Sequence, residues 1–573
     1  MTAEQENIPH GDPPPTDPGK PVSGGGLPLS RREFIGTAAA AGALAVGSGL
    51  GTAAAKTLTG SALQRSPSKK VIVQAMGLDI DLLDPHYFKT IPGYYAVCNL
   101  YDMMLDYEFT RQPDGGLYPV ADQHGNWKMK PWLAESWNVS RDQKTITFKL
   151  RKGLKFSDGR PLTAHDVKST WDRAAGVAGY GQLIMNMITI NHTSQMTVHD
   201  EYTVVLHLNK PNPFAMKMLS VNVLGIMNAH ALQAHATTSD PTAHKWLDTH
   251  AAGSGAYILA NWTPGVSWEL KPNPHYWNPG ALKNAGTLVR TIPNASERYN
   301  LLVKGDVDVA YDLLPKDLAA LRHNPNVRLI QFKVPWPYFL GMNNTIPPFN
   351  NKTVRQAIAY AIPQKTLVDK VLYGFARECK SPVAAGMPTS DFGLSPYQTN
   401  AAKTKQLLRQ AGVSNLKFDL AVQEGRPQDA QAAVWIQASL AQAGVQVNIV
   451  QMNDAEYFAK QAKKQLQAFI SEFYSWVNDP FYHLFWNFDS QATATNVVGY
   501  HNPTVDALIA KGIYSTNPSE RVLWSRQAQK IIIDDAAWAL LYQINYTIAV
   551  RKNIHDFNWY PDVGTRFLKV YKS

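Results

Sequence analysis

Helical segments alternate with short apolar strands through the second half of the chain, and this alternation is what most constrains the fold. Three segments carry apolar residues at helical spacing, and Gly412 and Gly444 stop two of them at their carboxyl ends. These segments are 354–361, 401–411 and 432–443. A short strand follows each helix, such as QVNIV at 446–450. Helices and strands that alternate in this way predict an α/β fold built on an open sheet.

A second informative run, TITFKLRKGLKFSDGRPLTAHDVKST at 145–170, predicts a strand, a tight turn and a capped helix. The first six residues alternate between apolar and polar, which is the pattern of a half-buried strand. Asp158 and Gly159 lie among turn formers, and Thr163 and Asp166 have the spacing of a capping box at a helix start. We therefore expect these four residues to shape the backbone rather than to bind a ligand.

The amino-terminal segment has the features of an export address. Residues 1–30 are rich in Pro, Gly and Asp and predict a disordered leader. Arg31 and Arg32 precede a weakly apolar stretch that ends in AAA at 53–55, so residues 31–55 predict a twin-arginine signal peptide. A retained membrane anchor is the alternative, although Ala and Gly give it little transfer energy. A linker at 56–68 would then lead into a buried strand, KKVIVQA, at 69–75.

The composition limits the partners that can be expected. The formal net charge is +10 over 573 residues, which can attract an anionic surface or an acidic ligand without requiring a specific partner. Nucleic-acid binding is not expected, because basic residues are not clustered with stacking aromatics and no known module is present. The two cysteines, Cys98 and Cys379, lack zinc-site spacing and could form one disulfide or two free thiols.

Several motifs together resemble family 5 of the bacterial extracellular solute-binding proteins, the dipeptide, oligopeptide and nickel binders. The run at 145–170 is the most specific of them, and the resemblance extends over about residues 70–550 in the family's order. The other motifs are LAESW (133–137), GSGAY (253–257), NPHYW (273–277), KGDVD (304–308), VRQAI (354–358) and LLRQAG (407–412).

The resemblance implies a type 2 periplasmic-binding-protein fold, in which two lobes are joined by a hinge and the first lobe carries an extra subdomain. Lobe I would comprise residues 69–87 and 251–333, with the extra subdomain at 88–250. Lobe II would comprise residues 334–543, and residues 544–573 would return to lobe I. Hinge closure would enclose the ligand between the lobes.

The resemblance also implies a function. We expect an exported protein of the periplasm or cell envelope that captures peptides and delivers them to an ABC permease, acting as a monomer without catalysis or cofactor. An oligosaccharide ligand and an exported hydrolase are the alternatives, although no GxSxG, HExxH or Walker motif occurs in the mature chain. Four histidines lie close together, but their spacing does not put two on one helical face, so no metal site is expected. They are His230, His235, His244 and His250.

The cleft candidates follow from the positions of family motifs. The loop after the first strand would supply Leu78 and Asp79 to the rim of lobe I. Trp336 and Tyr338 lie at the expected crossover between lobes. The segment after a lobe II strand would line the cleft where peptide binders pair with the ligand backbone. It comprises Glu472, Phe473, Tyr474, Ser475 and Trp476.

One of these positions departs from the family pattern. Peptide binders have a Trp-x-x-Asp-x-x-x-Pro motif whose Asp holds the α-amino group, and alignment on Pro480 puts Trp476 where that acid should be. Asp479 lies three positions away. An unpaired ammonium is costly in a closed cleft. The sequence therefore predicts weak binding of free dipeptides unless Asp79 or Glu472 substitutes, and better binding of longer or N-blocked peptides or of oligosaccharides.

Overall fold

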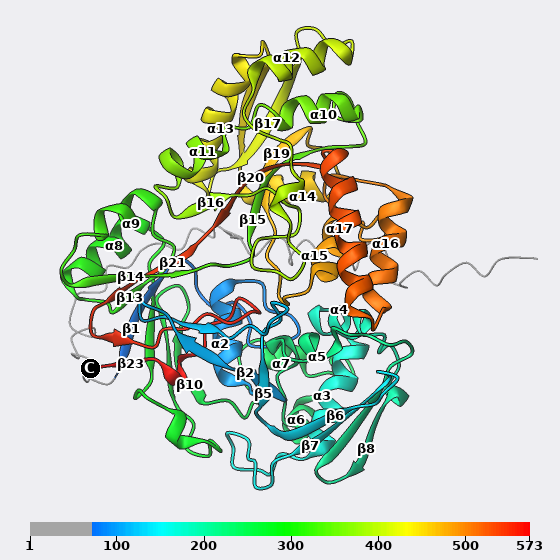
Figure 1. Cartoon of the computed structure of the whole chain (residues 1–573). Helices are drawn as coiled ribbons and strands as arrows, with labels where there is room; N and C mark the ends of the chain where they lie inside the picture. The colour runs from blue at the N-terminus through cyan, green and yellow to red at the C-terminus, as the bar shows by residue number, and fades with distance from the viewer. Residues whose placement is uncertain (1–70) are drawn as a thin grey trace, which may run out of the picture.

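The computed structural model describes residues 71–573, and two separate sheets organise it into two lobes (Figure 1). The larger sheet, in lobe I, has seven strands in the order β10-β11-β12-β1-β13-β21-β14. Their bounds are β1 (Ile72–Met76), β10 (Tyr257–Thr263), β11 (Ser267–Pro272), β12 (Thr287–Thr291), β13 (Val309–Ala310), β14 (Val327–Phe332) and β21 (Tyr546–Arg551). The central strand β1 is buried along its whole length, as its apolar run predicts.

Lobe II is built on a six-stranded sheet in the order β16-β20-β15-β19-β17-β18. Its strands are β15 (Pro337–Met342), β16 (Ala376–Glu378), β17 (Lys417–Gln423), β18 (Gln446–Met452), β19 (Ala468–Glu472) and β20 (Trp538–Ile544). The predicted helices are present as α10 (Lys352–Ala359), α12 (Ala401–Gln410) and α13 (Pro427–Ala441). Helix α13 begins five residues earlier than apolar spacing indicates, because Pro427 occupies its first turn.

Four further helices of lobe II lie near the carboxyl ends of the strands of its sheet or next to lobe I. They are α14 (Asp454–Ala462), α15 (Pro480–Phe488), α16 (Pro503–Tyr514) and α17 (Pro518–Asp534). In Figure 1, α15 and α17 lie at the side of the molecule that faces α4 (Tyr180–Met187) and α5 (Ala215–Met218) of lobe I.

The subdomain attached to lobe I contains a four-stranded antiparallel sheet in the order β6-β7-β9-β8. Its elements are β6 (Ala134–Val139), β7 (Thr145–Leu150), β8 (Met196–Asp200), β9 (Thr203–His207), α3 (Ala164–Gly176), α4 (Tyr180–Met187) and α5 (Ala215–Met218). The Asp166 carboxylate accepts hydrogen bonds from the backbone and hydroxyl of Thr163, 2.9 and 3.1 Å away, and from the backbone of Ala229. The predicted strand, turn and cap at 145–170 are therefore confirmed.

Two chain segments cross between the lobes. One joins β14 to β15 through residues 333–336, and the other joins β20 to β21 through Asn545. They run side by side, because Phe332 pairs with Tyr546 in the lobe I sheet and Pro337 pairs with Gln543 in the lobe II sheet. The two-lobed α/β architecture is as predicted, whereas the domain boundaries given above remain predictions.

Both cysteines are free thiols in this structure, so they do not form the disulfide that the sequence left possible. Cys98 lies in α2 (Ile91–Leu100) of lobe I and Cys379 follows β16 in lobe II. Burial raises the pKa of Cys379 to about 12. No helix within residues 71–573 is long and apolar enough to cross a membrane. The leader, the signal peptide and the linker lie outside the described residues.

Candidate functional site

The carboxyl ends of three lobe II strands meet at one edge of the sheet, beside lobe I. Strands β17 and β18 are parallel, and β19 runs parallel to β17, so all three end on the same side. In open α/β sheets this edge is where ligands bind. The last residues of the strands are Gln423, Met452 and Glu472.

A buried charge cluster occupies this edge. Arg426, at the start of α13, forms an ion pair with Glu472, and the hydroxyl of Tyr474 donates to the other Glu472 oxygen at 3.1 Å. Arg426 also lies 4.0 Å from Asp429, whose pKa burial raises to about 7. The Arg426 side chain keeps 14% of its surface exposed, whereas that of Asp429 is almost fully buried. Arg426 is thus a cation at the boundary between the lobes, and the carboxylates of Glu472 and Asp429 lie beside it.

Several buried polar atoms around this cluster have no hydrogen-bond partner within residues 71–573. Such atoms are uncommon in native proteins and each needs an explanation. They are the two carboxylate oxygens of Asp429, Oδ1 of Asp454, Oε1 of Gln423, the hydroxyl of Tyr542 and Nε1 of Trp336. These six atoms lie around the carboxyl ends of β17, β18 and β19 and around the crossing segments, so this edge of lobe II is polar as well as buried.

Aromatic rings form a wall between the charge cluster and the crossing segments. The ring of Trp336 lies 5.0 Å from that of Tyr474 and 5.1 Å from that of Tyr546. The Tyr546 hydroxyl is 3.1 Å from the hydroxyl of Tyr95 in α2, so the wall continues into lobe I. Tyr338 stacks on Tyr542 at 4.8 Å beside the charge cluster. Flat apolar faces with polar tips suit a ligand that is partly apolar and partly hydrogen-bonding.

Trp476 is inserted into an aromatic cluster of lobe I. Its ring lies 5.3 Å from Tyr180, 6.4 Å from Phe88 and 6.5 Å from Tyr94, and only 3% of the residue is exposed. The cavity beside it, lined by Leu183 of lobe I and by lobe II aromatics, holds about 10 Å³. That volume suits about one water molecule. The lobes are therefore closed against one another here, and ligand entry at this point requires them to separate.

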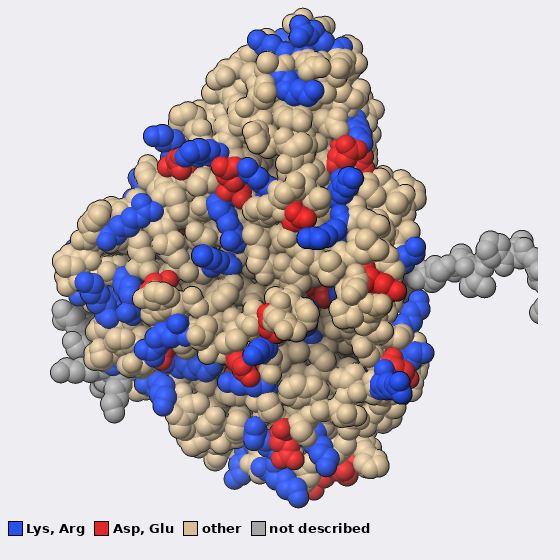
Figure 2. All heavy atoms as spheres, viewed as in Figure 1, with Lys and Arg blue, Asp and Glu red and all other residues tan. Residues whose placement is uncertain are grey.

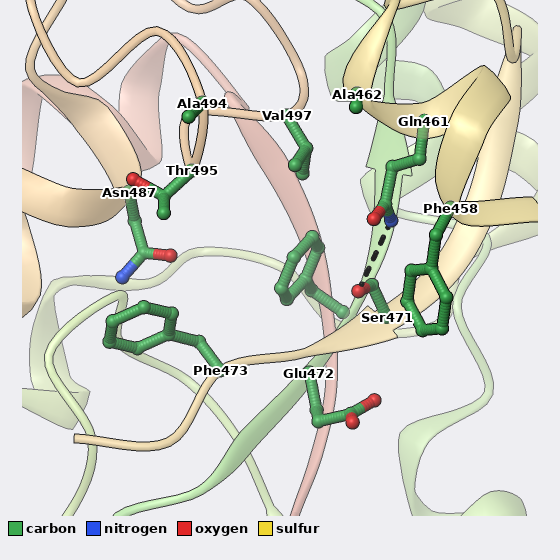
Figure 3. Close-up of a pocket in the computed structure, with 11 residues that line it drawn as sticks. Phe458, Gln461, Ala462, Ser471, Glu472, Phe473, Asn487, Ala494, Thr495 and Val497 are labelled. Carbon is green, nitrogen blue, oxygen red and sulfur yellow. Dashed lines mark hydrogen bonds between the residues drawn. The ribbon is translucent and has the colours of Figure 1, made fainter. Parts of the chain in front are cut away.

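A second small cavity lies inside lobe II, on the other face of β19. Figure 3 shows Ser471 and Phe473 on the side of this cavity and Glu472 pointing away from it, as the alternation of a strand requires. Gln461 donates to Ser471 across 3.4 Å, and the space holds about 30 Å³. It is too small for a peptide, and it shows that Phe473 packs into lobe II while Glu472 faces the charge cluster.

The remaining predicted residues have structural partners. Asp79 accepts hydrogen bonds from Trp262 at 3.0 Å and from the backbone of Gly265 at 2.7 Å, which fixes the loop after β1 to the β10–β11 turn. Leu78 precedes it and is half-buried. Ser475 is buried, with its hydroxyl 3.0 Å from Nδ1 of His483. Neither Asp79 nor Glu472 is thus free to receive an ammonium.

Asp479 is also engaged, in contacts that cross the lobe boundary. Its Oδ2 lies 2.6 Å from Arg521 of α17 and 3.2 Å from Lys217 of α5. Lys217 donates further to the carbonyl of Asn478 at 2.9 Å and to Asn126 at 2.8 Å. Burial raises the pKa of Asp479, but the positive charges of Arg521 and Lys217 outweigh this effect and hold the pKa below its usual value. We call Lys217, Asn126, Asn478 and Asp479 the interlobe latch.

Sequence reasoning missed Arg426 and Lys217. Each lies outside the family motifs, and each acquires its role only when segments distant in sequence are brought together. For Arg426 one signal was present, since an arginine and an aspartate follow the end of a predicted strand. The four neighbouring histidines lie away from this site. His235 stacks on Trp246, which also stacks on His250, and His244 contacts Asp84. Within residues 71–573 no group of three or more His, Cys, Asp or Glu side chains could hold a metal ion.

Residues 128–495 match the family described as "Bacterial extracellular solute-binding proteins, family 5 Middle". The chain therefore belongs to this family of binding proteins. It is 29% identical to the probable D,D-dipeptide-binding periplasmic protein DdpA of Escherichia coli K12 over 78% of this chain and 85% of that protein. It is 27% identical to the glutathione-binding protein GsiB of Escherichia coli O1:K1 over 87% of this chain and 94% of GsiB.

Solved structures show the same fold. The periplasmic binding protein DppA of Helicobacter pylori, in complex with the peptide STSA, superposes with a TM-score of 0.74 over 88% of this chain and 98% of DppA, at 24% identity. NikA of Brucella suis, in complex with Fe(III)-EDTA, gives the same TM-score over 88% of this chain and 99% of NikA, at 20% identity. One fold therefore carries chemically different ligands, and the ligand has to be argued from the site.

Proposed function

We propose that this protein captures peptides outside the cytoplasm, between its two lobes, and delivers them to an ABC permease. The observation that carries the proposal is the cation Arg426, buried except for 14% of its side-chain surface, at the carboxyl ends of β17, β18 and β19 and facing an aromatic wall. A guanidinium with a free edge binds carboxylates in a bidentate manner. A peptide supplies such a carboxylate together with the amide groups that can pair with unsatisfied polar atoms.

The names of the relatives support the same class of ligand, since one is described as binding D,D-dipeptides and another as binding glutathione. We propose that Trp336, Tyr338, Tyr474 and Trp476 line the cleft and that Glu472 orients Arg426. Phe473 and Ser475 support this segment from within lobe II, and Leu78 belongs to the rim. An uncharged oligosaccharide would use the aromatic wall but would offer no carboxylate to the exposed part of Arg426.

The surface supports a protein that meets a small solute and a membrane permease rather than a nucleic acid. Figure 2 shows Lys and Arg side chains spread over both lobes on this face instead of gathered into one patch. Phosphate-backbone recognition needs a continuous basic stripe. We propose a monomer, with an ABC permease as its only obligatory protein partner.

Calorimetry tests the proposal. We would titrate wild-type protein, Arg426→Gln and the control Arg409→Gln with a chymotryptic digest of casein, then with single peptides from the bound fraction, and with a cello-oligosaccharide series. Arg409 is an exposed arginine of α12 in the same lobe. The loss of a charge-assisted hydrogen-bond pair at Arg426 should weaken peptide binding about 10- to 100-fold. Binding of oligosaccharides but no peptides, or hydrolysis of the peptides, would contradict the proposal.

A further inference from the structure

Lobe I contains an acidic side chain that has no partner. Asp312 lies two residues beyond β13, its side chain is exposed, and it forms no hydrogen bond or ion pair with any residue in the 71–573 range. Every other acid considered above as an ammonium acceptor is engaged. Asp79 is bound by the β10–β11 turn, Glu472 by Arg426, and Asp479 by Arg521 and Lys217.

The backbone at Asp312 is held in an unfavourable conformation. Its φ angle is +50°, in the left-handed region that non-glycine residues rarely adopt. Arg298 fixes this conformation, because its guanidinium donates to the carbonyls of Tyr311 at 2.9 Å and of Asp312 at 2.7 Å. Strained residues that surrounding contacts hold in place cluster at ligand sites. The direction of the Asp312 side chain is therefore set by its fixed backbone, since the side chain has no hydrogen bond or ion pair of its own.

Asp312 lies next to the aromatic wall. In the β13–β21 pair, Val309 lies opposite Val550 and Ala310 opposite Ala549. Asp312 lies two residues beyond this pairing, and its negative charge adds to burial in raising the pKa of both Tyr95 and Tyr546. Figure 1 shows β13 and β21 close to where β16 and β20 of lobe II approach lobe I. The ring of Tyr311 also lies 5.8 Å from that of Tyr95, which is hydrogen-bonded to Tyr546.

Charges from both lobes act on Asp312. Desolvation by the surrounding protein raises its pKa, and the positive charges of Arg298 and Arg426 lower it. Since Arg426 belongs to lobe II, its positive charge and the unpaired carboxylate of Asp312 are within electrostatic range across the lobe boundary. Arg298 does not neutralise the carboxylate directly, because its hydrogen bonds go to backbone carbonyls, including those of Ile292 and Pro293.

We propose that Asp312 receives the ammonium group of the bound peptide, at a site whose walls are the rings of Tyr95, Tyr311 and Tyr546. This inference rests on the proposed function. A carboxylate forms charge-assisted hydrogen bonds with an ammonium, and nearby aromatic faces attract the same cation. Lobe I would bind the cationic end of the peptide and Arg426 of lobe II the anionic end. The ammonium is thus expected at a position in lobe I, away from Trp476, so free peptides should bind better than N-blocked ones, contrary to the expectation drawn from Trp476 alone.

The test compares retention of amine-bearing and amine-blocked peptides. Wild-type protein, Asp312→Asn and the control Asp306→Asn would be incubated with a chymotryptic digest of casein mixed with an equal amount of the same digest, isotopically labelled and fully acetylated. Asparagine tolerates the left-handed conformation, so Asp312→Asn should fold and melt as the wild type does. Asp306 is an exposed acid at the other end of β13. Retained peptides would be quantified by mass spectrometry.

We expect wild type and Asp306→Asn to retain free peptides about 10- to 100-fold better than acetylated ones, and Asp312→Asn to lose this preference. Peptides without lysine show whether the α-ammonium alone suffices. If wild type retains neither digest, peptide capture itself fails. If wild type retains peptides but does not distinguish the acetylated form, or if Asp312→Asn keeps the preference, the ammonium site is refuted while peptide capture stands.

Discussion

Replacing Lys217 by Met should shift the unliganded protein toward an open form. The Lys217 ammonium donates three hydrogen bonds, to Asn126 of its own lobe and to the carbonyl of Asn478 and the carboxylate of Asp479 in the other lobe. Asn478 adds a return contact, since its side-chain amide donates to the carbonyl of Gly125 at 2.6 Å. Methionine fills a similar volume but forms none of these bonds.

The magnitude follows from what remains after the substitution. Breaking a buried ion pair costs about 3–5 kcal/mol when a charge is left unpaired. Asp479 keeps Arg521 at 2.6 Å and the backbone of Phe481 at 3.0 Å, so the cost falls to about 2–3 kcal/mol. Because two of the three acceptors belong to lobe II, most of this loss falls on the closed state. The ratio of closed to open protein should drop about 30- to 150-fold.

Small-angle scattering of the unliganded protein measures this shift. We expect a larger radius of gyration for Lys217→Met than for wild type, and a compact form again at saturating ligand. Lys168→Met is the matched control, because Lys168 pairs with Asp172 one helical turn away on α3 and crosses no boundary. Identical scattering of Lys217→Met and wild type, with both folded, would refute the idea that the latch holds the lobes together.

Three further predictions concern single groups. Asp429 has its pKa raised by burial to about 7, so the folded state binds one more proton than the unfolded state between about pH 4 and pH 7, and stability falls as pH rises through that range. Asp429→Asn should therefore be more stable than wild type at pH 8, by up to about 4 kcal/mol, and equally stable near pH 4. If thermal melts show the same stability difference between the two proteins at every pH in this range, the raised pKa of Asp429 is refuted. Asp166→Ala removes an acceptor of three hydrogen bonds and should lower the free energy of unfolding by at least about 2 kcal/mol in denaturant titration, and a loss below 0.5 kcal/mol would mean the cap is dispensable. Replacing Arg31 and Arg32 by Lys should leave uncleaved precursor in the cytoplasm, and export of mature protein by the double variant would exclude the twin-arginine route.

Local patterns predicted the scaffold of this protein well. The strand at β7, the turn at Gly159 and the cap at Asp166 depend on neighbours within about six residues, so their signals are present in the sequence itself. The start of α13 was placed too late, because Pro427 and Gln428 carry no apolar signal although proline is well suited to a first helical turn. Such errors shift an element by a turn and leave the topology unchanged.

The cleft could be predicted only in part. Trp336, Tyr474 and Trp476 were recognised from the motif positions beside them, and the first two are in contact. Arg426 and Glu472 are separated by 46 residues, and Lys217 and Asp479 by 262, so their pairing depends on how the sheets and lobes come together. No sequence pattern identifies Asp312. It differs from the other candidate ammonium acceptors, Asp79, Glu472 and Asp479, in having no partner, and partners are seen only in the folded structure.

The positions of these charges separate closure from recognition. The interlobe latch lies at α5 and α15, whereas Arg426 and Asp312 lie at the strand ends next to the crossing segments. The latch therefore stabilises the closed form without any contribution from ligand, whereas the main contribution of the cleft charges is to hold a ligand bound between them. Apparent affinity is the intrinsic affinity multiplied by the fraction of protein that can bind. A stronger latch would keep the protein closed, and the ligand could not enter because Trp476 fills the lobe boundary in the closed form. A weaker latch would leave the protein open, and the ligand would then contact only one lobe. Substitutions in the latch should consequently change affinity for every peptide by one common factor, whereas substitutions at Asp312 or Arg426 should change the ranking of peptides.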